Sequence, residues 1–212
     1  MNLTVIIDNY FVQNTQKFIF MNLIETLTKH FGYDPLAMID PNTQDVVHKN
    51  GEADLHRFSQ AGIPAILVGF HRLLASDAGT EEILHPSNST NWVSTIFGNE
   101  ATEVVKRVNA YSGFDQAGTE AKLNDIAAKA ASLINEATPS AKPVDIKAVL
   151  ESQIDNILTY LPPSLHLGDL LNENTLDDRT HKMEGPISSL IQAIGSGFSK
   201  PDEDSRKQNP SS

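Results

Sequence analysis

The chain carries pairs of histidine and carboxylate residues whose spacing could support acid–base chemistry. His166 lies three residues before Asp169, and a carboxylate that orients an imidazole is what a general base requires. The leucines around this pair equally indicate a packed turn, and Asp178 and His181 have similar spacing in a polar segment. A small-ligand-binding or hydrolytic site built from His166, Asp169 and the distant His56 is therefore an alternative function of the chain.

A second pattern, Glu82 followed by His85, has the Glu-x-x-His spacing found in di-iron bundles. Such sites need two copies and two further glutamates, whereas we find one copy, with Pro86 directly after it. An exposed helix end, with His85 near the negative end of the helix dipole, explains the pattern better. The chain also has no cysteine, which excludes Cys-ligated zinc and iron–sulfur sites. We therefore expect no metal and no cofactor.

The remaining reactive side chains do not form a recognisable catalytic site. His56 and His71 flank an apolar run, where a solvent-facing or core histidine is expected. Ser196 stands between two glycines, but the strand of a nucleophile loop and the Lys-Ser/Thr of a phosphate loop are missing. We assign no catalytic residue, and the sequence favours a protein that is not an enzyme.

An apolar stripe near the C-terminus is the first candidate for a functional surface. It has helical spacing and carries no charge from Pro186 to Ser199, and such a face must pack on something. The stripe could dock on its own domain, bind a partner protein or a second copy, or lie on a membrane surface, although basic flanks are missing. The leading prediction is a non-enzymatic protein-interaction module that binds through Ile187, Leu190, Ile191, Ile194 and Phe198.

Composition narrows the classes of partner. The 212 residues include 16 Lys and Arg against 27 Asp and Glu, a net charge of −11 that repels phosphate backbones. The densest basic cluster is only Arg206-Lys207, so we expect no nucleic-acid binding. The longest apolar run, Ala61 to Phe70, is about half the length of a membrane-spanning helix. The first residues also lack the basic start of a secretory signal, so we expect a cytoplasmic protein.

Helical periodicity dominates the chain, while an alternating strand pattern is plausible only at Leu3, Val5 and Ile7. The periodicity predicts an all-α fold, a compact bundle of six to eight short helices. Apolar residues recur every three or four positions within 20–31, 63–74, 104–111, 123–134, 146–161 and 187–198.

Capping residues predict where several helices begin and end. Asp34-Pro35 suits an N-cap and a first helical turn, and Asn99 suits another N-cap. Gly113 suits a left-handed C-terminal cap, and Pro162-Pro163 should end the fifth helix. Pro64 either starts a fresh helix or lies within a longer helix that runs from Glu52.

The predicted organisation has one main domain, residues 21–171. A linker (172–184), a separate C-terminal helix (185–199) and a disordered tail (200–212) follow. Met1-Asn2-Leu3 recurs as Met21-Asn22-Leu23, so residues 1–20 are either an extension upstream of the true start or a genuine first helix.

The segment GEADLHRFSQAGIPAILVGF at residues 51–70 has a distinctive pattern, with Gly51, Gly62, Ile63, Pro64 and Gly69 among its key positions. On this motif, residues 21–171 resemble the YidB-like family, bacterial proteins with an all-helical domain of unknown function. Residues 96–98, 111–114 and 157–171 resemble later family segments. The chain departs from the family at 127–131, where AAKAA replaces a Pro–aliphatic–Gly core. The resemblance implies an all-α fold and no established activity.

Overall fold

The computed structural model describes residues 22–39, 54–87, 90–138 and 143–171. No strand occurs within these ranges, and the predicted all-α fold is confirmed. The predictions for residues 1–20, Met21, the linker 172–184, the helix 185–199 and the tail 200–212 lie outside the described residues. The elements are α2 (Leu23–His30), α3 (Asp54–Leu73), α4 (Asp77–Leu84), α5 (Trp92–Phe97), the 3-10 helix η1 (Gly98–Glu100), α6 (Ala101–Ser112), α7 (Gln116–Glu136), α8 (Pro143–Glu151), α9 (Ile154–Leu158), the 3-10 helix η2 (Pro163–Leu165) and α10 (Leu167–Leu171).

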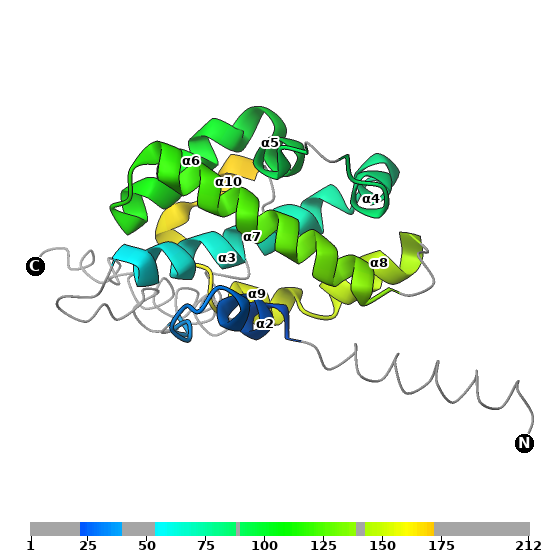
Figure 1. Ribbon diagram of the computed structural model, residues 1–212, viewed down its shortest axis with the longest axis horizontal. Coiled ribbons are helices and arrows are strands. Elements are labelled where there is room, and N and C mark those ends of the chain that lie inside the picture. Colours follow the sequence, from blue (N-terminus) through cyan, green and yellow to red (C-terminus); the bar gives the residue numbers. More distant parts are fainter. Residues whose placement is uncertain (1–21, 40–53, 88–89, 139–142, 172–212) are drawn as a thin grey trace, which may run out of the picture.

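Helix α3 is the centre of the bundle. Every residue from Phe58 to Phe70 is buried, as expected for a helix that is apolar around its whole circumference. It packs against α2, α5, α6, α7, α8 and α9, and Figure 1 shows α7 crossing it. Pro64 lies inside α3, which confirms the alternative of a longer helix running through this proline.

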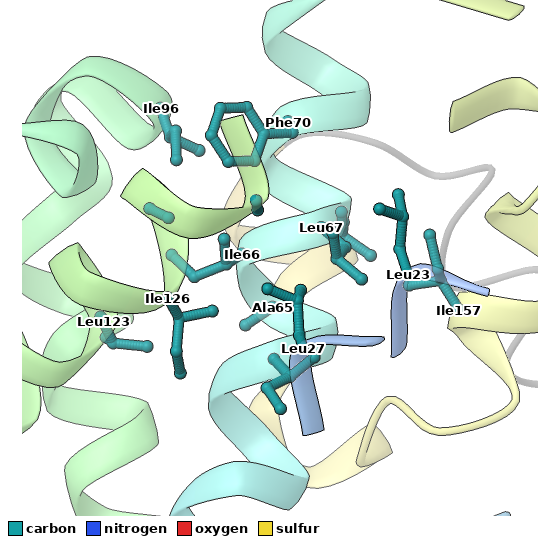
Figure 2. Packing of buried hydrophobic residues seen from close by; sticks show 14 of the residues in the cluster. Leu23, Leu27, Ala65, Ile66, Leu67, Phe70, Ile96, Leu123, Ile126 and Ile157 are labelled. Atoms are coloured by element: carbon teal, nitrogen blue, oxygen red, sulfur yellow. The ribbon is translucent and has the colours of Figure 1, made fainter. Parts of the chain in front are cut away.

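The core joins α3 to both of its sides. Figure 2 shows Leu67 facing Leu23 of α2, while Ile66 lies beside Ile126 of α7. These side chains are almost fully buried, and burial of each contributes about 1.5–3 kcal/mol. The buried residues form one cluster that runs from α2 to α10, so the described helices pack as a single bundle.

The segment after α2 is not helical, so the helix start predicted at Asp34-Pro35 is wrong. The buried side chain of Gln60 on α3 binds the main chain of this segment instead. Its Oε1 accepts the Ala37 N–H at 2.8 Å, and its Nε2 donates to the Ala37 carbonyl at 3.0 Å. Nε2 also donates to the Tyr160 carbonyl at 2.8 Å. These bonds satisfy the backbone of residue 37 without a helix.

Two other predicted helices differ from the structure, one at its start and one in its middle. Asn99 lies within η1 and does not cap α6, because the chain turns at Gly98 (φ +56°) and passes directly through a 3-10 turn into α6. The helix predicted over 146–161 is divided into α8 and α9. Gln153 lies in the intervening turn, where its Oε1 accepts the N–H of Leu23 at 2.8 Å. Gly113 (φ +80°) has the predicted left-handed conformation after α6.

Candidate functional site

His166 lies in the turn between η2 and α10, whereas Asp169 lies in the first turn of α10, and both side chains are exposed. His166 has a positive φ of 46°, which is uncommon for a residue with a side chain. Arg107 of α6 stabilises this turn, since its Nη1 donates to the carbonyls of Leu165 at 3.0 Å and His166 at 2.7 Å. No hydrogen bond or ion pair in the described ranges joins His166 to Asp169. The main chain at His166 therefore has a structural role.

Arg107 is itself oriented by a carboxylate. Its Nε donates to Glu103 Oε1 at 3.1 Å, one helical turn away on α6. This hydrogen bond is the main reason that the pKa of Glu103 is lowered, and the neighbouring Lys106 adds to the effect. The polar cluster of Glu103, Arg107 and the turn at 165–166 thus attaches the C-terminal part of the bundle to α6.

The other histidines occupy separate places. His71, at the end of α3, is half-buried with Nε2 3.3 Å from Glu151 Oε1 of α8. His56 is half-buried near the start of α3. His85 is exposed directly after α4, 4.0 Å from Glu81 Oε2, which confirms the predicted exposed helix end. In the part of the chain that the structure describes, no group of three His, Asp or Glu side chains gathers closely enough to hold a metal ion.

A hollow of about 270 Å³, which we call the α2 groove, lies between α2 and the non-helical segment after it. Its apolar wall consists of Ile24, Pro35 and Leu36, together with the rings of Tyr33 and Tyr160. Its rim carries the Glu25–Lys29 ion pair of α2. The complete lining is Asn22, Ile24, Glu25, Thr28, Lys29, Tyr33, Pro35, Leu36 and Tyr160.

Several contacts hold the walls of the α2 groove in place. Asn22 caps α2 through its Oδ1, which accepts the N–H of Glu25 at 3.2 Å. Tyr33 stacks on Phe31 and meets the edge of Phe58 from α3. Burial raises the pKa of the Tyr33 phenol, and the carboxylate of Asp125 adds to the shift. Tyr33 therefore stays a neutral hydrogen-bond donor at physiological pH.

A second hollow, of about 340 Å³, lies where the end of α3 meets α5 and η1. It is lined by polar and apolar groups that include Arg72, Ser76, Phe97 and Glu100. Neither this hollow nor the α2 groove is lined by a histidine. The structure thus does not place the histidines of the alternative function beside either hollow.

Large apolar side chains are rarely exposed on the described surface. Within the described ranges only Met38, Leu55 and Val144 are both large and exposed, and they lie in separate parts of the chain. None of the described helices is long and apolar enough to span a bilayer. The predicted partner-binding residues, Ile187 to Phe198, lie outside the described residues.

The α2 groove was not predicted from the sequence. It depends on Tyr33 and Tyr160, which are distant in sequence and carry no local signal, and on a segment that we interpreted as a helix start. Comparisons with protein families, with curated proteins and with solved structures found no match to this chain.

Proposed function

We propose that this protein is a non-enzymatic helical interaction module whose binding residues are Ile187, Leu190, Ile191, Ile194 and Phe198. The main support for the proposal is the difference in charge between this stripe and the rest of the chain. Residues 186–199 carry no charge, although charged residues make up 20% of the sequence. Apolar residues at this helical spacing are typical of segments that bind in an apolar groove.

The described bundle supports this division of roles. Most of its large apolar side chains pack in one core, and the three exposed ones lie in separate parts of the chain. Several of its polar side chains bind the main chain of other parts of the bundle, including Gln60, Arg107 and Asn135, whose Nδ2 donates to the Ile83 carbonyl at 2.6 Å. The bundle is thus a scaffold to which a binding segment is attached.

The resemblance of residues 21–171 to the YidB-like family belongs to the same proposal. The motif positions Gly62, Ile63, Pro64 and Gly69 are all buried in α3, where they pack against neighbouring helices. The close approach of neighbouring side chains favours small residues at Gly62 and Gly69, which agrees with the resemblance without adding an activity.

Photo-crosslinking tests the proposed function. Benzoylphenylalanine at position 190 of the full chain, expressed in its source cell, should give a discrete adduct with a partner protein or a second copy. Ile191→Asp with Phe198→Asp should abolish the adduct, because two charges then lie on the apolar stripe. Ser189→Asp with Ser196→Asp adds the same charge on the opposite helical face and should leave the adduct. The proposal fails if both double variants give the same adducts as the unmodified stripe.

A further inference from the structure

We propose that the apolar stripe of the same chain docks in the α2 groove when no partner is bound, so that the protein covers its own binding surface. This inference rests on the proposed function, because it takes the same residues, Ile187 to Phe198, as the binding segment. It adds a site on the described bundle and a reason why the stripe would be protected from non-specific association.

The chemistry of the α2 groove fits an uncharged apolar segment. Its apolar wall consists of Ile24, Pro35, Leu36 and two tyrosine rings, and Asn22 and Thr28 add uncharged polar groups. Its charged residues, Glu25 and Lys29, already form an ion pair with each other. A charged segment would lose the hydration of its charges on entering the groove and would find no unpaired opposite charge there. An uncharged segment does not have this desolvation cost.

The size of the α2 groove indicates how much of the stripe it holds. A hollow of about 270 Å³ accepts one or two large side chains rather than a whole helix. Helices that bind in grooves insert anchors spaced three, four or seven residues apart. Ile191 and Ile194, or Ile194 and Phe198, have this spacing. Tyrosine rings are well suited to this contact, since each offers an apolar face and a hydroxyl donor.

The chain is long enough to bring the stripe to the groove. The described part ends at Leu171, and residues 172–186 precede the stripe. Fifteen residues reach up to about 50 Å when extended. A compact domain of this size has a radius of gyration of about 14 Å. The extended segment is therefore longer than the bundle is wide, and this length allows the stripe to reach a distant surface of the bundle such as the groove beside α2.

The tether also favours docking within one chain over docking between two chains. A tether of this length holds its end at an effective concentration of about 1 mM, roughly 100-fold above a protein solution of 10 µM. Even a weak intrinsic affinity would then keep the stripe in its own groove. An external partner that binds tightly would displace it. The apparent affinity for that partner would equal the intrinsic affinity multiplied by the fraction of chains whose stripe is not docked.

Because the chain has no cysteine, the proposal can be tested by site-directed disulfide formation in the full chain. Leu36→Cys lines the groove and Ile191→Cys lies on the stripe. Under mild oxidation at micromolar concentration, this pair should form a disulfide within one chain at least tenfold faster than a control pair. The control combines Ile191→Cys with Thr102→Cys, at an exposed position of α6. Equal rates for the two pairs, or a cross-link found only in dimers, would overturn the proposal.

Thiol labelling keeps the test informative if a disulfide cannot adopt the required geometry. In a chain whose only cysteine is Leu36→Cys, this thiol should react with a bulky maleimide. The reaction should be several-fold faster when Ile191→Asp and Phe198→Asp are added, because the groove is then uncovered. An unchanged labelling rate contradicts docking in the groove. Partner binding in the photo-crosslinking experiment does not depend on this result, so the two proposals can fail separately.

Discussion

Gln60 illustrates how one buried side chain can direct the path of two distant segments. Its amide binds the main chain at Ala37 and at Tyr160, and its own exposed fraction is only 1%. Ile39 completes the arrangement by donating its N–H to the Thr159 carbonyl at 2.8 Å. The outer wall of the α2 groove is therefore positioned by a residue that lies in the core.

Replacing Gln60 by leucine should destabilise the bundle by about 2–4 kcal/mol, because two carbonyls and one N–H lose their buried partner. Urea denaturation followed by circular dichroism measures this as a lower midpoint. Gln116→Leu, at the exposed start of α7, is the matched control and should change stability by less than about 0.5 kcal/mol. A Gln60 variant as stable as the control would contradict this role.

Tyr33 gives the groove a predicted pH dependence. Burial is the main reason that its pKa lies above the ordinary value of 10.0, so the folded state prefers the neutral phenol. This contribution to stability is complete below pH 10 and is lost as the pH rises through the pKa of the folded state. Tyr33→Phe, which cannot ionise, should therefore lose less Tm between pH 8 and pH 11 than the parent protein. Parallel Tm curves for the two proteins would contradict the assignment.

At the scale of elements, the close approach of α5 to α3 depends on Gly69. A Cβ at this position would lie 2.7 Å from the Phe97 ring and still closer to Ile96. At Gly62, one face of α3 meets α7, and a Cβ would lie 3.1 Å from the Leu123 methyl group, which can move slightly. The two glycines of one helix thus differ in how closely their neighbours approach.

Gly69→Ala should destabilise the protein by about 1–3 kcal/mol through overpacking between α3 and α5. Gly62→Ala should be nearly neutral, since the higher helix propensity of alanine offsets a small shift of Leu123. Thermal unfolding of the two variants measures the difference. If both variants lose equal stability, the close contact with α5 is not what excludes a side chain at Gly69.

The sequence predicted the long helices well because their apolar stripes span many turns. Helix α7 has 21 residues and keeps its stripe over 123–134, whereas for α3, with 20 residues, the stripe at 63–74 left open whether the helix begins before Pro64. The short helices α4 and α5, with 8 and 6 residues, contain too few repeats to show a period. Asp34-Pro35 has the local features of a helix start, but hydrogen bonds from Gln60, 23 residues away from Ala37, prevail. Tertiary contacts of this kind leave no mark on the local sequence.

At the scale of the whole molecule, the described helices form a bundle around one core, and the segment proposed to bind lies outside the described residues. Of the candidate functional residues, the sequence identified the stripe by its lack of charge but could not indicate the groove. The groove forms only when α2, the segment after it and Tyr160 come together. A sequence pattern can therefore suggest what binds, whereas the receiving surface needs the folded chain.

We propose that the stripe binds a protein while the bundle folds without it. Fluorescence-detected sedimentation of the labelled full chain in an extract of its source cell tests this most directly. The parent protein and the Ser189→Asp, Ser196→Asp variant should sediment faster than a monomer. The Ile191→Asp, Phe198→Asp variant should sediment as a folded monomer. If all three sediment alike, or if the Ile191→Asp, Phe198→Asp variant sediments as an unfolded chain, the claim is wrong.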